Sequence, residues 1–117
     1  MKEVVKIFKA LSDSNRLRIL KMLEVRFLCV CEITDILQLA PSTVSKHLAI
    51  LREAGLIVDN KDGKWVNYAL SQDADPEHPH EIVSLVQSWL ATDKTVIADM
   101  KAVSTVDRNQ LCSTQMR

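Results

Sequence analysis

Three cysteines are the residues of this chain with the most distinctive chemistry. Cys29 and Cys31 are separated by a single valine, and Cys112 lies near the C-terminal end. So few thiols, in a chain without a targeting signal, do not indicate a disulfide framework. The cysteines are therefore interpreted either as buried packing residues or as ligands for a soft ion.

A second chemically distinctive stretch covers residues 40–54. Pro41 suits the first turn of a helix and Gly55 suits its end, so we predict a helix over about 42–54. One side of this helix is a narrow apolar stripe formed by Val44, Leu48 and Leu51. The opposite side carries small, hydroxylated or basic residues, namely Ser42, Thr43, Ser45, Lys46 and Ala49. Such a face suits the DNA major groove; the alternative is an ordinary amphipathic surface helix.

Length and composition indicate one helix-rich domain. The chain has 117 residues, of which 47% are apolar and 4% aromatic, and its longest uncharged run near the C-terminus is too short to span a membrane. We therefore expect a cytoplasmic protein without a membrane partner. The net charge is zero, but residues 1–70 carry eleven basic against eight acidic side chains, and residues 71–117 carry four against seven. A mildly basic N-terminal part and an acidic C-terminal part fit a DNA-binding body with a separate association element.

Apolar spacing predicts three helices before this stretch, over about 3–11, 14–24 and 30–38. Asp13 offers a cap to the second of them, whose cations Arg16, Arg18 and Lys21 are expected on the outside, facing solvent or, as the alternative, contacting phosphates. A short turn joins the third helix to residues 42–54, which makes a helix-turn-helix.

After Gly55 the pattern becomes that of a β-hairpin. Residues 56–58 and 64–70 flank a turn-forming quartet, with Val66, Tyr68 and Leu70 expected on one side. Lys61 and Lys64 would lie near the tip, within reach of phosphates. A helix-turn-helix followed by such a hairpin is a winged helix.

The remainder is predicted to form a long helix and a tail. Apolar residues at 4-3 spacing run over about 80–103, interrupted by Asp93. A helix this long cannot bury its face on so small a body, so we expect it, with helix 3–11, to pair with a second copy. Residues 1–103 would form the domain, and residues 104–117 a mobile tail.

These segments together resemble the ArsR/SmtB family of metal-responsive winged-helix repressors, over roughly residues 4–100. The matching pieces are residues 11–20, 28–33, 42–48, 51–56 and 63–70. The resemblance implies a mainly α fold with a small β-hairpin, and a homodimer that leaves operator DNA when a toxic metal or metalloid binds, rather than an enzyme. It implies DNA contacts from Ser42, Thr43, Ser45, Lys46 and His47, and from Lys61 and Lys64. His47 matches the family's recognition-helix histidine, but it borders the buried stripe and could equally anchor the helix.

Within this family, the Cys-Val-Cys motif marks thiolate sensors of As(III), Sb(III), Cd(II) or Pb(II), and no organic cofactor is implied. On a regular helix Cys29 and Cys31 would point about 200° apart, with Cβ atoms about 7 Å apart. Two thiolates on one ion can be no more than about 4.6 Å apart. Ion capture is therefore expected to unwind or re-aim the start of the third helix and so lower operator affinity.

The chain also departs from the family. The arsenic-type motif has a third cysteine where this chain has Thr34, and the cadmium- and lead-type cysteines of an N-terminal extension are missing. We therefore hypothesise that Cys112 is the third ligand, from its own or the partner subunit; the alternative is a two-thiolate site completed by water or a small thiol. His78 and His80 precede the last helix, which makes the zinc-type site improbable.

Two other functions compete with metalloid sensing. The first is a redox sensor on the same scaffold, in which Cys29 and Cys31, or one of them with Cys112, are oxidised. The second is a thiol enzyme such as an arsenate reductase. The sequence lacks the phosphate-cradling glycine loop and the Cys-x-x-Cys motif that such an enzyme would need.

Overall fold

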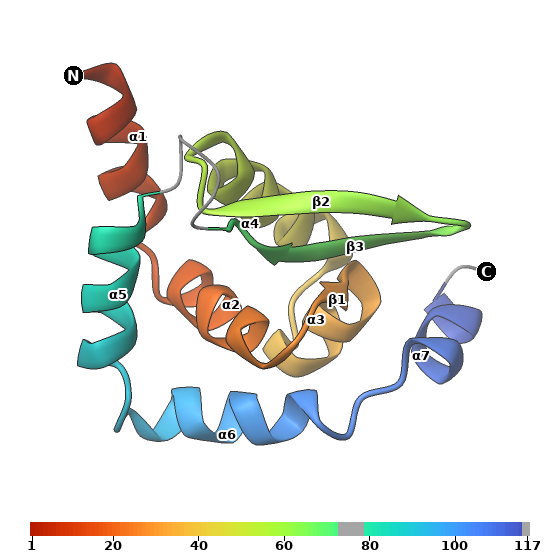
Figure 1. The fold of residues 1–117 in the computed structure, drawn as a ribbon. Helices are drawn as coiled ribbons and strands as arrows, with labels where there is room; N and C mark the ends of the chain where they lie inside the picture. The colour runs from red at the N-terminus through yellow and green to blue at the C-terminus, as the bar shows by residue number, and fades with distance from the viewer. Residues whose placement is uncertain (73–78, 116–117) are drawn as a thin grey trace.

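The computed structural model describes residues 1–72 and 79–115, and the side chains of residues 1–72 and 79–111. Helices in these ranges surround the base of a small antiparallel sheet (Figure 1). The elements in chain order are α1 (Lys2–Ala10), α2 (Ser14–Val25), β1 (Leu28–Cys29), α3 (Val30–Leu37), α4 (Pro41–Glu53), β2 (Ile57–Asp62), β3 (Trp65–Leu70), α5 (His80–Trp89), α6 (Lys94–Val103) and α7 (Arg108–Gln115). None of the described helices is long and apolar enough to cross a lipid bilayer.

The helix-turn-helix forms as predicted. Asp13 caps α2 by accepting a hydrogen bond from the Arg16 amide at 3.1 Å. Between α3 and α4 the backbone turns through Gln38, which adopts a left-handed conformation with φ of 58°. The predicted apolar stripe of α4 is confirmed, because Val44, Leu48 and Leu51 are all buried in the core.

The hairpin is also confirmed, and the structure adds a third strand to it. β2 and β3 pair antiparallel around Gly63, whose φ is 60°, and the short strand β1 pairs with the other edge of β3. Tyr68 and Leu70 pack against the core, whereas Val66, expected on the same side, is exposed because the outer part of the hairpin extends beyond the body (Figure 1). A strand of two residues is too short to show a period, so the sequence did not predict β1.

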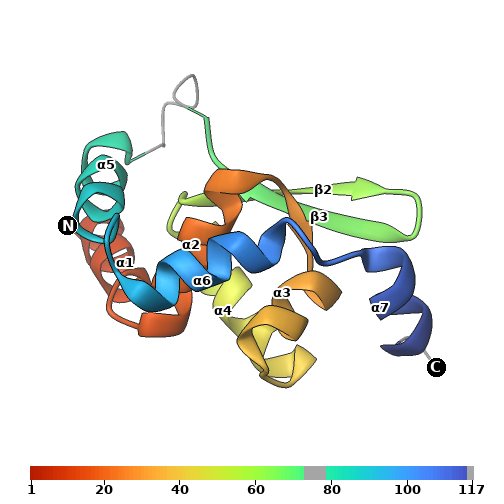
Figure 2. The same cartoon turned by 90° about the horizontal axis from the view of Figure 1, so that it is seen from below.

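The predicted long helix over 80–103 is wrong, because the chain breaks between Trp89 and Lys94. α5 starts beside the C-terminal end of α1 and continues below it, and α6 turns away to cross under α2 (Figures 1 and 2). Asp93, which interrupts the apolar pattern, caps α6 by accepting a hydrogen bond from the Val96 amide at 3.0 Å. The break allows the buried residues of α6 to pack on α2, while α5 keeps its contact with the end of α1 around Phe8.

The segment predicted as a mobile tail contains a helix. Residues Arg108–Gln115 form α7, which packs against α3 (Figure 2). The weak apolar periodicity of this segment did not predict it.

The cations of α2 do not face solvent as predicted but hold other helices. Arg18 donates two hydrogen bonds, of 2.8 and 3.0 Å, to the carboxylate of Asp99 in α6. Lys21 is 4% exposed and pairs with Glu24 at 2.8 Å. Arg16 donates to carbonyl oxygens at the end of α1. Lys21 also donates to the Gln87 carbonyl of α5 at 3.3 Å. A sequence pattern does not show these partners, because each of the three cations has at least one partner in another helix.

Replacing Asp93 with leucine tests the break between α5 and α6. Asp93→Leu completes the apolar pattern but removes the cap, so we expect the free energy of unfolding to fall by about 1 kcal/mol. Asp93→Asn keeps an acceptor and should change it by no more than a few tenths of a kcal/mol. Urea denaturation of both variants measures the difference; a stabilised Asp93→Leu protein would instead indicate one continuous helix.

Candidate DNA interface and cysteine site

The outer face of α4 carries the predicted DNA-contacting side chains. Ser42, Thr43, Ser45 and Lys46 are all exposed, opposite the buried stripe. Because the stripe is fixed in the core, this face is presented as a rigid surface. Its short hydroxyls and single cation suit base edges and phosphates.

His47 lies differently from the other predicted DNA contacts. Its side chain is 14% exposed, and its Nδ1 lies 3.1 Å from Arg16 Nη1 and 3.9 Å from the Asp13 carboxylate. A guanidinium can only donate, so Nδ1 accepts this bond and the imidazole proton is placed on Nε2. This geometry favours the role of anchoring α4 to α2.

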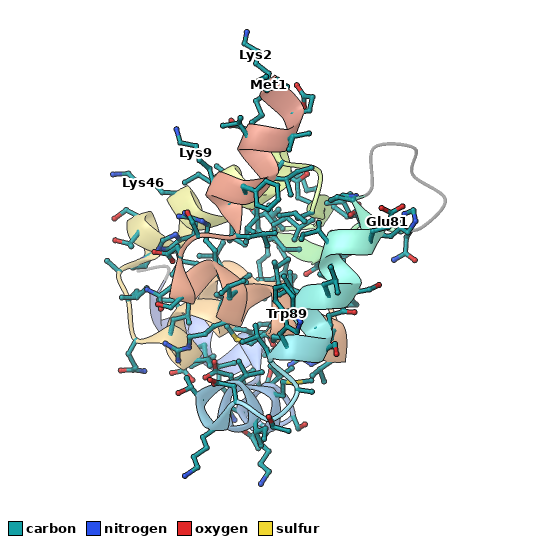
Figure 3. The ribbon with its side chains drawn as sticks, turned by 90° about the vertical axis from the view of Figure 1, so that its left-hand side faces the viewer. Met1, Lys2, Lys9, Lys46, Glu81 and Trp89 are labelled. Carbon is teal, nitrogen blue, oxygen red and sulfur yellow. The ribbon has the colours of Figure 1, made fainter. Side chains whose placement is uncertain are left out.

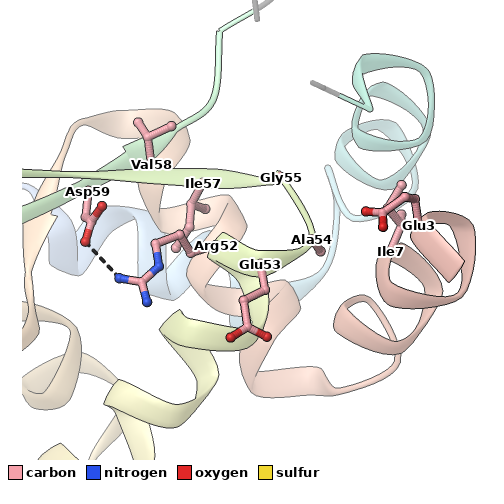
Figure 4. Close-up of a pocket in the computed structure, with 9 residues that line it drawn as sticks. All are labelled: Glu3, Ile7, Arg52, Glu53, Ala54, Gly55, Ile57, Val58 and Asp59. Carbon is pink, nitrogen blue, oxygen red and sulfur yellow. Dashed lines mark hydrogen bonds and ion pairs between the residues drawn. The ribbon is translucent and has the colours of Figure 1, made fainter. Parts of the chain in front are cut away.

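The two predicted wing cations, Lys61 and Lys64, are exposed near the turn between β2 and β3. The Lys64 ammonium lies 4.9 Å from the centre of the Trp65 ring. At the other end of the hairpin, Arg52 of α4 bonds to Asp59 of β2 at 2.9 Å, beside an open pocket between α1 and the start of β2 (Figure 4). The pair connects the wing to the end of the recognition helix.

Lys9 is an additional cation that the sequence did not associate with DNA. It extends from α1 to the same side of the molecule as Lys46, away from Glu81 of α5 (Figure 3). The two lysines are far apart in sequence, and they extend to the same side of the molecule because α1 packs against α4. No local pattern could have predicted this.

Cys29 occupies the junction between the sheet and the helix-turn-helix. It pairs with Asn67 in the sheet, and it is also the residue that precedes α3. It is a buried thiol, 3% exposed, whose backbone amide donates to Glu32 Oε1 at 3.0 Å. Burial, together with the nearby Glu32 charge, raises the pKa of this thiol.

The predicted geometry of the cysteine pair needs correction. Cys29 has an extended backbone, with φ of −94° and ψ of 170°, and only Cys31 lies within α3, where it is half-buried. The 200° separation of a regular helix therefore does not apply. What opposes joint ligation is instead the burial and strand pairing of Cys29.

Glu32 connects this cysteine segment to the end of α6. Its second carboxylate oxygen lies 3.0 Å from Arg26, and the same nitrogen of Arg26 donates to the carbonyl oxygens of Val103 and Val106. Glu32 is buried but the Arg26 side chain is 36% exposed, so the pair is only partly shielded from water. A movement of the cysteines would therefore disturb contacts at the end of α6.

Cys112 belongs to α7, and its side chain lies outside the described residues. The helix itself packs against α3, so positions 31 and 112 are on neighbouring helices. Within the described part of the chain, no three His, Cys, Asp or Glu side chains are grouped closely enough to hold an ion. His78 lies outside the described residues, and His80 is exposed beside Glu81.

Comparison with known proteins agrees with this arrangement. Residues 13–58 match the family described as bacterial regulatory protein, arsR family. The arsenical resistance operon repressor of Escherichia coli K12 is 37% identical over 93% of this chain and 88% of its own length. The arsenic resistance regulator ArsR1 of Pseudomonas putida is 38% identical over 80% of this chain and 77% of its own. The cadmium resistance regulator CadC homolog of Staphylococcus aureus is 39% identical over 69% and 64%.

The comparison with solved structures points to the same class of protein. Reduced HlyU from Vibrio cholerae superposes with a TM-score of 0.65 and 31% identity, covering 80% of this chain and 90% of its own. The homodimeric winged helix-turn-helix domain of Mb0332 from Mycobacterium bovis, a possible ArsR-family regulator, has a TM-score of 0.65 and 26% identity, covering 77% and 80%.

The thiol enzyme considered from the sequence is therefore excluded, since the family and these relatives are DNA-binding regulators. The buried stripe of α4 and the wing beside it form a winged helix-turn-helix, and the similarity to the Escherichia coli repressor covers 88% of that protein's length. This chain is therefore a winged helix-turn-helix transcriptional repressor of the ArsR family.

Proposed function

We propose that this repressor binds operator DNA as a homodimer in the cytoplasm and is released when As(III) or Sb(III) binds its cysteines. The observation that carries this proposal is the position of Cys29. One residue is both part of the wing sheet and the cap position of α3. A ligand that pulls Cys29 out of this position would disturb both DNA-reading elements together.

The step can be followed through the residues of the chain. Capture requires Cys29 to leave its buried site and lose its proton, because the thiolate is the ligand. This movement breaks the pairing with Asn67 and the hydrogen bond to Glu32. The wing then loses its edge strand and α4 loses its support from α3, so operator affinity falls.

Cys31 and Cys112 complete the proposed ligand set; Cys31 is disulfide-bonded in this structure and must be reduced before it can bind an ion. As(III) takes three sulfurs in this kind of site, and Thr34 replaces the cysteine usual in the arsenic-type motif. Because α7 packs against α3, Cys112 of the same subunit is the better candidate for the third ligand. The relatives include cadmium as well as arsenical resistance regulators, so Cd(II) and Pb(II) remain as alternative inducers.

A homodimer would use the face formed by α1 and α5. Large apolar side chains are exposed there, namely Val4, Val5, Phe8, Leu85 and Trp89. An apolar hollow between the two helices is lined by residues that include Phe8, Ile82 and Trp89. Two-fold symmetry would place the two recognition helices in successive major grooves, about 34 Å apart.

Redox sensing is the second candidate. The disulfide bond of Cys31 favours it, but one observation weighs against Cys29 as the reactive thiol. Burial raises the pKa of Cys29, and redox-sensing cysteines are instead exposed and readily ionised. Release by peroxide in the absence of any response to arsenite would favour the redox sensor.

Lys46→Ala tests the DNA interface. We expect weaker binding to an operator fragment selected from random duplexes, with the slope of log affinity against log salt reduced by about 0.9 for each phosphate that is no longer neutralised. Fluorescence anisotropy at several salt concentrations measures this. Lys101→Ala removes an equal charge from an exposed position of α6, so it should change neither the affinity nor the salt slope. An unchanged slope for Lys46→Ala would remove Lys46 from the interface.

Serine substitution of each cysteine tests the sensor. In protein reduced with a phosphine, which leaves arsenite unchelated, Cys29→Ser, Cys31→Ser and Cys112→Ser should each raise the arsenite concentration for half-release by roughly tenfold or more. Adding Thr34→Cys to Cys112→Ser supplies the third cysteine of the arsenic-type motif and should restore the response. Unchanged release by Cys112→Ser would leave the two-thiolate site. Parallel titrations with antimonite, cadmium, lead and zinc identify the inducer.

The environment of Cys29 predicts its reactivity. In a Cys31→Ser/Cys112→Ser protein, iodoacetamide should modify Cys29 at pH 8 more slowly than a small thiol by roughly tenfold or more, with the rate rising above the usual thiol pKa of about 8.5. The folded-state pKa is raised, so the stability that Cys29 contributes is present below about pH 8.5 and is lost as the pH rises further. Mass spectrometry gives the rates, and urea should abolish the protection. Modification as fast as that of a small thiol would contradict the buried site.

A further inference from the structure

Arg108, the first residue of α7, contacts the wing at three points. Its Nη1 donates to the side-chain oxygen of Asn67 at 2.8 Å, and its guanidinium carbon lies 4.9 Å from the centre of the Trp65 ring. Its other terminal nitrogen lies 3.7 Å from the carboxylate of Asp62. Trp65 and Asn67 belong to β3 and Asp62 ends β2, so one side chain reaches both strands of the hairpin.

Around Trp65 and Asn67, the hairpin has little other support from the body. β1 pairs only with Tyr68 and Asn67, and the strands continue outward past that point to a tip where Lys61 and Lys64 are exposed. A two-stranded hairpin is only marginally stable by itself in water. A contact from outside the sheet is therefore needed to restrict the tip to one position.

The contacts of Arg108 suit this task. Asn67 is 8% exposed, so the bond from a charged donor is partly shielded from water. The Trp65 ring has two cations, those of Lys64 and Arg108, each 4.9 Å from its centre. Asn67 is also the partner of Cys29 across the sheet. The wing, the cysteine segment and α7 thus meet at a single residue.

We infer that Arg108 is a positioning residue for operator binding, which holds the wing so that Lys61 and Lys64 reach the DNA backbone. This inference rests on the proposed DNA-binding role of the wing, and it assigns to α7 a function that does not depend on Cys112 as a ligand. Because α7 packs on α3 as well, a shift of α7 would be transmitted to the wing through Arg108.

The test uses the full-length protein without metalloid. Arg108→Ala should weaken operator binding by roughly tenfold or more, the scale of one hydrogen bond to a charged group. Arg108→Lys keeps the positive charge but loses the planar guanidinium, which contacts the Trp65 ring and donates to Asn67 at the same time. This variant should therefore also bind the operator more weakly. Lys101→Ala removes the same charge as Arg108→Ala and serves as the matched control. Thermal unfolding of each variant shows whether the fold is retained.

Two readouts separate positioning from direct contact with DNA. If Arg108 acts through the wing, its substitution should have little further effect in a Lys61→Ala/Lys64→Ala background, and hydrogen exchange at residues 61–66 should accelerate in free Arg108→Ala protein. Normal binding by Arg108→Lys, or additive effects in the double background, would overturn the inference and indicate a charge contact. If wild-type protein binds no operator, the proposed function itself fails; if it binds and Arg108→Ala binds equally well, only this inference fails.

Discussion

The arrangement of the whole molecule depends on one short backbone segment, Leu28–Cys29. Its two residues complete the sheet by pairing with Tyr68 and Asn67, and the second of them precedes α3 directly. The sheet forms the wing and α3 supports the recognition helix, so the two DNA-reading elements share this segment. A cysteine at such a position is well placed to link ligand binding to DNA binding, because any change there alters both elements.

Buried and half-buried charges attach the C-terminal helices to this centre. Arg18 holds Asp99 of α6, while Arg26 bridges Glu32 and the last carbonyl oxygens of that helix. Such pairs contribute little net stability, but they are costly to break one partner at a time, so they fix orientation. α6 consequently follows the body, whereas α5 remains beside α1 with its apolar side chains exposed. The same chain segment thus supplies an internal brace and a face for a second subunit.

The sequence predicted the central elements well because their signals are local. The caps, the apolar stripe of Val44, Leu48 and Leu51, and the turn residues of the hairpin all act within a few neighbouring positions. The prediction of a helix over 80–103 failed for a related reason. Its apolar spacing continues through the break, and Asp93 could be interpreted as one imperfect position until its contact with the Val96 amide was seen.

By itself, the sequence determined the winged helix-turn-helix, the exposed face of α4 and the identity of the three cysteines. Only the tertiary structure decided what those side chains can do. It buried Cys29 in a sheet and turned His47 towards Arg16. It also directed Lys9 and Lys46 to the same side of the molecule and placed Arg108 against Trp65. The physical reason is that periodicity and capping are short-range properties of the chain, whereas burial, pKa and charge pairing depend on partners that are distant in sequence.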